Sequence, residues 1–367
     1  MELTDIGVDG LDLRIGRQII TWGTADRFHP TANLNPLDVH DALKFGAQVA
    51  NEMIALRWHP DASLGDEDDP WLTELGLEIV FVPFFKPAQL PQSAGLAFTD
   101  EQEFTRRADS EALQPLLDLQ RTLTQAGTVF NYHPLVELPG REIANSMAGA
   151  RLQWKLLGVD MSASYFRGFD DFPRAEHVDA ELDGTLEETF IKLTYPRMQV
   201  LGVDAATSLD FLDGLGLWGE VAVVFHDDLY RVVDTHGQIE TIVEKEHAKG
   251  QFVKATVGTD YTPLPWWYLN VQYLHGFVDE FGAAKLGDYL VPGMDFKLFR
   301  DTLLLRFFSI IDLQDRSFVL FPQVVATPWN GGEVSVGAFL FMGPDDTKFG
   351  SDVAGRSTVF VKGKASF

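Results

Sequence analysis

Apolar and polar residues alternate one by one in many separate segments of this 367-residue chain. In residues 148–156, Ala, Ala, Leu, Trp and Leu alternate with Gly, Arg, Gln and Lys. Segments 252–261 and 332–341 follow the same pattern. Because successive side chains of a β-strand point to opposite faces of the sheet, each segment predicts a strand with one apolar and one polar face.

About fifteen such segments occur, of roughly the length that a tilted membrane strand requires. They are 11–22, 48–58, 75–85, 148–156, 159–169, 188–200, 203–212, 217–227, 252–261, 266–275, 289–300, 303–312, 318–327, 332–341 and 357–367. A further strand fits in 228–250, and tight turns are expected at 157–160 and 201–204. We therefore expect an all-β fold: one transmembrane antiparallel β-barrel of about 14–18 strands over residues 1–367, closed by 357–367 against the first strand. An amphipathic sheet of a soluble protein is the alternative.

The final segment, 357–367, places Val, Val, Gly and Ala on one face and Lys, Lys and Ser on the other, and it ends on Phe367. This tail resembles the closing strand of bacterial outer-membrane barrels, in which a terminal Phe belongs to the assembly signal. The first residues, Met1 to Asp5, have neither the basic nor the apolar part of a signal peptide. Because bacterial barrels have even strand numbers, we expect at least one strand before Leu11, and a signal peptide and N-terminal strand or strands to be missing.

Composition narrows the chemistry. The chain has no cysteine, which excludes disulfides, thiol catalysis and cysteine-ligated metals. Its formal net charge of −25 opposes binding to nucleic acid. Acidic clusters at 65–69 and 343–346 are either solvated loop charges or sites where divalent cations bridge to lipopolysaccharide phosphates. No run of 18 apolar residues is present, so no transmembrane helix is expected.

Residues 86–147 do not follow the strand pattern. Thr99 with Gln102 fits a helix start, and a helical spacing of leucines follows it. We expect a partly helical insertion that either covers an outer loop or plugs the barrel. An apolar stripe needs a cover, so we expect an apolar pocket at the barrel mouth, suited to a hydrophobic substrate. Its members are Phe84, Phe85, Phe98, Leu113, Leu116 and Leu117.

A more specific motif lies near the amino terminus, as RIGRQIITWG at 14–23 and LNPLD at 34–38. It resembles the signature of the proteobacterial outer-membrane porin-like family catalogued as domain of unknown function 1302. The matching residues are Gly16, Arg17, Gln18, Trp22, Gly23, Asn35, Pro36 and Asp38. The resemblance implies a barrel in the bacterial outer membrane with an unassigned substrate, often a hydrophobic compound or lipid, and no catalytic residues. Within the motif, we expect Trp22 to belong to the aromatic girdle at the membrane boundary. The motif either secures the 24–45 loop or takes part in gating.

The polar members of the alternating segments are the candidate pore-lining residues. They are Arg14, Arg17, Arg151, Lys155, Arg167, Glu220, Lys254, Asp260 and Arg306. Such mixed charges would orient a polar path. The expected function is passage of a small or hydrophobic solute across the outer membrane. The expected partners are outer-membrane lipids and lipopolysaccharide, with a periplasmic or membrane protein left open.

Two other classes stay open, a structural barrel that acts as a scaffold or sheath for a partner and an outer-membrane enzyme. The enzyme reading has little support, because HExxH, GxSxG and GxGxxG patterns are absent. His226-Asp227-Asp228 and 38–41 hold potential metal ligands, but polar residues are expected at such strand ends and loops. We therefore expect no catalytic site, metal or cofactor.

Overall fold

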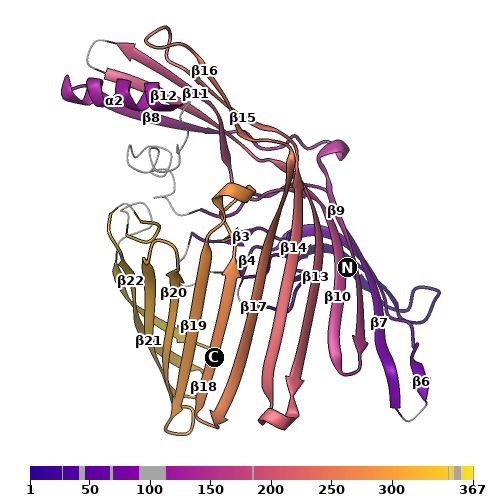
Figure 1. The fold of residues 1–367 in the computed structure, drawn as a ribbon. Coiled ribbons are helices and arrows are strands. Elements are labelled where there is room, and N and C mark those ends of the chain that lie inside the picture. Colours follow the sequence, from indigo (N-terminus) through magenta and orange to yellow (C-terminus); the bar gives the residue numbers. More distant parts are fainter. Residues whose placement is uncertain are drawn as a thin grey trace.

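The computed structural model describes residues 1–26, 28–40, 46–66, 69–90, 113–183, 186–345, 347–350 and 357–366. They form one large curved antiparallel sheet, a five-stranded sheet beyond one end of it, and a two-stranded sheet of β3 (Leu37–Asp38) and β4 (Ala47–Gln48). Figure 1 shows the long strands of the large sheet, here called the main sheet, below the five-stranded sheet, here called the second sheet.

The main sheet has sixteen strands, within the range expected from the sequence. Their order is β1 (Glu2–Leu3), β2 (Leu11–Gln18), β5 (Asn51–Trp58), β7 (Asp69–Val82), β9 (Met147–Leu156), β10 (Val159–Phe169), β13 (Arg197–Leu209), β14 (Leu215–His226), β17 (Gly250–Leu264), β18 (Trp267–His275), β19 (Asp288–Leu298), β20 (Leu303–Asp312), β21 (Phe318–Trp329), β22 (Gly332–Met342) and β23 (Thr358–Ala365); β6 (Leu64–Asp66) pairs with β7 off this path.

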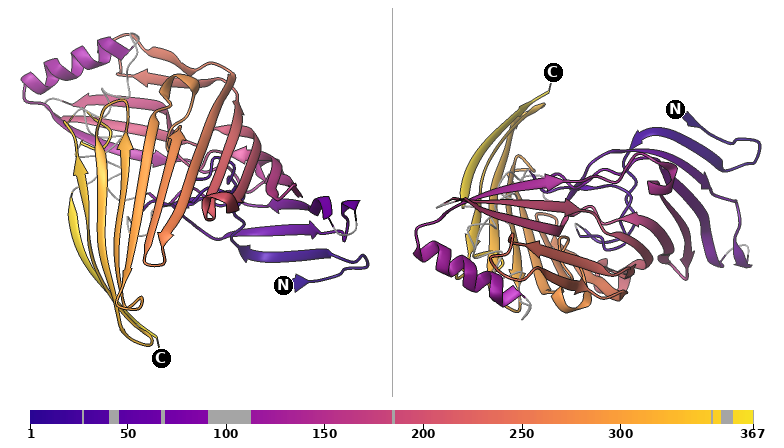
Figure 2. Two further views of the ribbon diagram at one scale, coloured as in Figure 1. Left: turned by 60° about the horizontal axis from the view of Figure 1, so that its bottom comes forward. Right: turned by 90° about the horizontal axis from the view of Figure 1, so that it is seen from above.

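The expected closure of the last strand on the first is wrong. Among the described residues, β1 has β2 as its strand neighbour and β23 has β22, so the main sheet is open. Figure 2 shows the two ends of the curved sheet well apart. The sequence periods locate strands, but they carry no information about which edges meet.

The two faces of the main sheet differ as the alternation predicted. Leu152, Val257, Val336 and Val361 are exposed on the convex face. Apolar side chains are exposed at alternate positions of most other strands too, and they include Ile54, Ile79, Leu201, Val203, Val221, Val253, Val271, Met294, Phe307, Val324 and Val334. The opposite, concave face carries the buried polar residues, among them Glu78, Asp204 and Glu220.

The second sheet has the order β16 (Ile242–His247), β15 (Leu229–Asp234), β11 (Arg174–Asp183), β12 (Leu186–Thr194) and β8 (Val129–Val136). Four of its strands are connected directly in sequence to strands of the main sheet: β11 follows β10, β12 precedes β13, β15 follows β14 and β16 precedes β17. Helix α2 (Gln114–Gln125) packs on it through Leu113 and Leu116, which lie in one buried cluster with Ile191 and Leu193. Short 3-10 turns occur at η4 (Ile143–Asn145), η5 (Asp210–Leu212) and η6 (Ala283–Lys285).

Local departures from the expected elements have simple causes. The turn expected at 201–204 is wrong, because those residues lie inside β13 and pair with β10 (Tyr165↔Leu201, Ser164↔Gly202). The turn at 157–160 is confirmed in its first half, where Leu157 and Gly158 have positive φ between β9 and β10. The insertion contains a helix, α2, as expected, whereas the expected helix start at Thr99 and Gln102 lies outside the described residues. The insertion also contains strand β8, which pairs in parallel with β12.

Candidate functional site: the segment inside the curved sheet

Residues 19–50, here called the inserted segment, leave the main sheet after β2 and return to it at β5. The described part runs along the concave face instead of outside the sheet, as Figure 2 shows from above. Its side chains and backbone contact β7, β13, β14 and β18. The interior of the curve is therefore occupied by the chain's own N-terminal region.

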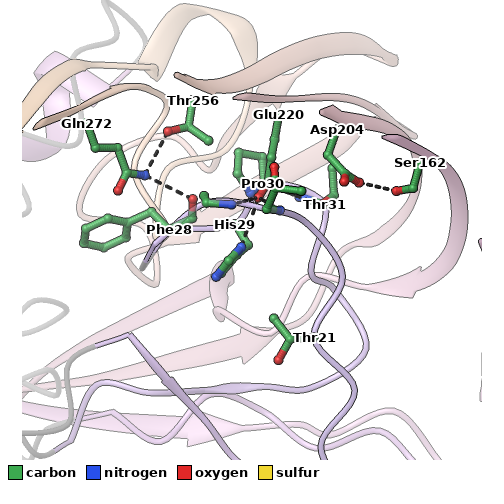
Figure 3. Close-up of polar contacts among 12 residues, drawn as sticks. Thr21, Phe28, His29, Pro30, Thr31, Ser162, Asp204, Glu220, Thr256 and Gln272 are labelled. Carbon is green, nitrogen blue, oxygen red and sulfur yellow. Dashed lines mark hydrogen bonds and ion pairs between the residues drawn. The ribbon is translucent and has the colours of Figure 1, made fainter. Parts of the chain in front are cut away.

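Glu220 on β14 is the centre of these contacts (Figure 3). Its Oε1 accepts hydrogen bonds from the backbone N–H groups of Thr24 (2.7 Å) and Ala25 (2.6 Å), and it lies 3.0 Å from Nδ1 of His29. Its Oε2 accepts from the Thr31 hydroxyl at 2.8 Å and from the Thr31 N–H at 3.4 Å. Glu220 is 1% exposed. The inserted segment thus supplies the donors that replace water around a buried carboxylate.

Gly23 explains why the segment can approach so closely. A Cβ at this position would lie 2.3 Å from Oε1 of Glu220, and the residue has φ +98°. Both the space and the backbone conformation favour glycine here. Gly23 of the sequence motif is therefore required by the carboxylate that it faces.

Trp22, expected at a membrane boundary, lies instead inside the curve and is 1% exposed. Its indole Nε1 donates to Oε2 of Glu78 on β7 at 2.8 Å, and Glu78 also pairs with Arg57 on β5. The ring fits over Gly149 of β9, where a Cβ would lie 2.5 Å from it. This anchor joins the inserted segment to three neighbouring strands.

Asn35 ties the two ends of the inserted segment together. Its Oδ1 accepts from Ile20 N–H at 2.8 Å, and its Nδ2 donates to Gln18 O (3.1 Å) and Val49 O (2.9 Å). The carbonyl of Pro36 accepts from Val49 N–H at 2.7 Å. Gln18 itself donates to Met53 O at 3.2 Å. These bonds close the loop, so the contacts of the motif match the interpretation that it secures this segment.

The upper end of the segment reaches the rim of the sheet. Gln272 on β18 donates to Phe28 O at 3.3 Å, and Asp171, between β10 and β11, accepts from Leu37 N–H at 2.9 Å. Loss of hydration, together with the charge of Asp170, raises the pKa of Asp171 to about 7. Asp38, in β3, forms a parallel bridge with Gln89. The segment is therefore held at its start, middle and upper end.

Other charges on the concave face are paired with one another. Arg151 donates to Ser162 Oγ at 2.9 Å and lies 3.5 Å from Asp204. Arg306 forms a two-pronged pair with Asp295, at 2.8 and 2.6 Å. Lys155 lies 3.2 Å from Glu74 near the lower turns. Paired charges of this kind polarise the interior without leaving an uncompensated ion.

Seven of the nine expected pore-lining residues belong to the concave set by alternation: Arg14, Arg151, Lys155, Glu220, Lys254, Asp260 and Arg306. At least three of these seven side chains do not simply line an open pore. Glu220 is fully covered, Lys254 donates to Phe277 O at 2.8 Å and so holds a rim loop, and Arg14 pairs with Glu2 at the open edge.

The prediction that Arg17 and Arg167 line the interior is wrong, because both lie on the convex face. Arg17 is exposed on the same face of β2 as Ile15, opposite Glu52 of β5. Arg167 is exposed on the same face of β10 as Tyr165, whereas Phe166 between them is buried. Gly16, in the same motif, has open space where its side chain would be. Polar residues near a strand end do not mark the interior, because the apolar band does not extend that far.

The expected apolar pocket does not form as one unit. Phe85 packs against Phe169 (ring centres 5.4 Å apart) and Tyr195 (4.8 Å), whereas Leu113 and Leu116 lie in the core of the second sheet. Phe84 is 44% exposed. Phe98 and the side chain of Leu117 lie outside the described residues. A cavity of about 490 Å³ instead lies between the second sheet and the rim, lined by charged and aromatic side chains that include Arg231, Glu246, Phe281 and Lys348.

Sequence reasoning missed Glu78 and Asp171 as anchors of the inserted segment. The sequence holds a signal that could have identified Glu78, because it is the one polar residue of an otherwise apolar segment, Leu77 to Val82. Asp171 carries no such signal. Its role depends on the position of Leu37, which is 134 residues away in the chain.

No family model matches this sequence, and a search of curated proteins finds no significant relative. Among the described residues, no helix is long and apolar enough to cross a membrane.

Proposed function

We propose that this protein is a porin-like component of the bacterial outer membrane that passes a small or hydrophobic solute along the concave side of the main sheet. The resemblance of the 14–38 motif to the outer-membrane porin-like family supports the same assignment. In this proposal the inserted segment narrows the path, and the second sheet stands on one side of the membrane.

The observation that carries the proposal is the inverted polarity of the main sheet. On β14, Val221 is 40% exposed while Glu220 beside it is 1% exposed, and β17 and β22 repeat this arrangement with Val257 and Val336 outside and Thr256 and Ser335 buried. A sheet in water exposes its polar face. A wide band of exposed apolar side chains opposite a polar interior is the pattern of a membrane barrel wall.

The inserted segment decides how wide the path is. It is held by hydrogen bonds at discrete points, of which Glu220 is the most densely bonded. Removing the hydrogen bonds that Glu220 accepts should release the inserted segment from the concave face of the main sheet without altering the convex face. Purified full-length protein in planar bilayers should therefore show a small conductance that rises in Glu220→Ala.

The matched control is Val221→Ala, the next residue on the same strand but on the convex face. It should leave the conductance of the wild type unchanged. If neither the wild type nor Glu220→Ala passes any solute, in conductance and in liposome-swelling assays, the channel proposal is contradicted.

A scaffold or sheath is the second candidate, and one observation favours it. The concave face is already filled by the inserted segment, and β8 at the edge of the second sheet exposes Val129, Leu135 and Val136. A filled interior beside an exposed apolar edge suits a partner-binding barrel. Conductance separates the two candidates, because a scaffold needs no open path even when Glu220 is replaced.

A further inference from the structure

The cavity between the second sheet and the rim of the main sheet, here called the rim cavity, has the size of a ligand site. Its volume of about 490 Å³ lies within the range of about 300–1,000 Å³ that is usual for small-molecule pockets. Phe281 lines this cavity and also lines a smaller one, of about 80 Å³, beside Phe28 and Leu37 of the inserted segment. The rim cavity is therefore adjacent to the concave interior.

The walls of the rim cavity carry more negative than positive side chains. Five carboxylates and four cationic side chains line it: Glu246, Asp279, Glu280, Asp312 and Asp315, against Arg174, Arg231, Lys285 and Lys348. His247 adds no charge at neutral pH, because burial lowers its pKa to about 4. In the described part of the chain, Asp312 and Asp315 accept hydrogen bonds only from backbone N–H groups and the Ser317 hydroxyl. The charge of the walls therefore favours a cationic ligand.

A cage around an ammonium group lies on the rim side of this cavity. Nζ of Lys348 lies 2.7 Å from Oε1 of Glu280 and 3.2 Å from Oδ1 of Asp279. It also lies 4.5 Å from the ring centre of Phe277 and 5.0 Å from that of Tyr289. Carboxylates combined with aromatic faces suit a positively charged nitrogen. These four partners of Lys348 are here called the ammonium cage.

The ammonium cage is held together without Lys348. Oε2 of Glu280 accepts from the N–H groups of Phe277 (2.7 Å) and Gly287 (2.8 Å), and Oε1 accepts from the Tyr289 hydroxyl. The rings of Phe277 and Tyr289 contact each other, with their centres 5.0 Å apart. Because these bonds place the carboxylate and both rings, the ammonium group of another molecule can take the position of the Lys348 side chain.

We propose that the rim cavity binds a primary organic amine, whose ammonium group replaces that of Lys348 in the ammonium cage. The apolar part of the amine lies against Phe281 and Leu286, which line the same cavity. Lys348 is then an internal competitor that lowers the apparent affinity for the amine. The net charge of −25 attracts cations and repels anions, which favours the same class of ligand. The binding site stands by itself, whereas the further step that the amine is the solute that passes rests on the proposed function.

Isothermal titration calorimetry of the full-length protein in lipid nanodiscs, with n-butylamine at neutral pH, tests the site. The ligand control is n-butyrate, which has the same chain length and the opposite charge. The wild type should bind n-butylamine and not n-butyrate. Lys348→Ala should bind n-butylamine about tenfold more tightly, because the internal competitor is gone. Asp279→Asn, at a side chain that is 34% exposed, should bind it about tenfold more weakly, because a charge-assisted bond is lost.

Lys285→Ala is the matched control, since it removes another lysine of the same cavity that lies outside the ammonium cage. It should change the affinity by less than about threefold, as expected for a partly exposed charge. Equal gains in the two lysine variants would reduce the effect to general charge and overturn the proposal. Binding of n-butylamine to Lys348→Ala but not to the wild type would also overturn it, because Lys348 would then be a permanent part of the cage.

Conductance and liposome swelling keep this test apart from that of the channel. Binding of n-butylamine to the wild type without any solute flux would support the site and contradict the channel proposal. Solute flux in a wild type that does not bind n-butylamine would reject the site and support the channel proposal.

Discussion

The main sheet and the second sheet use the same two-residue period with opposite results. On β14 of the main sheet, Val221 is exposed and Glu220 is buried. On β12 of the second sheet, Ile191 and Leu193 are buried under α2, whereas Lys192 points outward and pairs with Glu137 and Glu176. The two-residue period determines which side chains share a face of the sheet. Which of the two faces is buried depends on the elements that pack against the sheet. At these positions, where α2 covers one face, the second sheet has the polarity of a sheet in water.

The largest expected effect comes from adding one charge to an exposed valine in each sheet. Val257→Lys, on the convex face of the main sheet, should destabilise the reconstituted protein by about 2–4 kcal/mol, the cost of a lysine facing the middle of a bilayer. Val243→Lys, on the second sheet, should change stability by less than about 0.5 kcal/mol, as at an ordinary wet surface. Both valines are more than half exposed, at 56% and 65%.

Urea unfolding in lipid vesicles, followed by tryptophan fluorescence, measures both variants. Equal effects at the two positions would remove the distinction between the sheets.

Two buried glutamates give the next comparison. Glu220→Gln should lower the free energy of unfolding by about 1.5–3 kcal/mol. The neutral amide weakens the charge-assisted hydrogen bonds and places a donor where Thr31 or Ala25 needs an acceptor. Glu187 on β12 is 4% exposed and accepts from Thr189 at 3.2 Å, and burial raises the pKa of this carboxyl. Glu187→Gln should therefore cost much less or stabilise the protein.

Unfolding free energies in the same vesicles measure this pair. Proteolysis between residues 19 and 50 gives a second readout, which should accelerate in Glu220→Gln alone. A larger loss of unfolding free energy in Glu187→Gln than in Glu220→Gln would show that Glu220 does not hold the inserted segment.

For a change of one pH unit, Asp171 makes the smallest of the expected contributions to stability, and this contribution depends on pH. Its pKa is raised to about 7, so the folded protein keeps a proton that the unfolded chain loses above about pH 4. The native state therefore binds more protons across this range, and stability falls as pH rises from about 4 to 7, by up to about 1.4 kcal/mol per pH unit, and levels off above pH 7.

Asp171→Asn should remove this component and keep an acceptor for Leu37 N–H. The measurement is the difference in unfolding free energy between wild type and variant at pH 5, 6, 7 and 8. A difference that does not change with pH would show that Asp171 is ionised throughout.

The sequence was sufficient to predict most strands of the main sheet and most of their faces, because each strand carries its own period and Leu152 or Val257 needs no distant partner to be placed. It divided β13 between two expected strands, 188–200 and 203–212. The second sheet was mostly missed. Its β15 and β16 are six residues each, and β8 depends on parallel pairing with β12 across more than 50 residues of chain. Local patterns do not encode such pairings.

The site was predicted in its parts rather than in its arrangement. Glu220 and Trp22 were both singled out, one as a pore charge and the other as a boundary aromatic. Their actual roles arise because the inserted segment folds inward, which brings Ala25 to Glu220 across 195 positions. Nothing within either short segment indicates that contact.

The central claim is that the convex face of the main sheet lies against lipid, and a nitroxide scan of β17 in reconstituted bilayers tests it most directly. The chain has no cysteine, so single cysteines from 252 to 257 can each be labelled uniquely. The account predicts that accessibility to oxygen, which is concentrated in lipid, is high at Val253, Ala255 and Val257 and low at Phe252, Lys254 and Thr256. Accessibility to a water-soluble nickel complex should be low at the first three. High nickel accessibility at Val253 and Val257 would place this face in water and contradict the account.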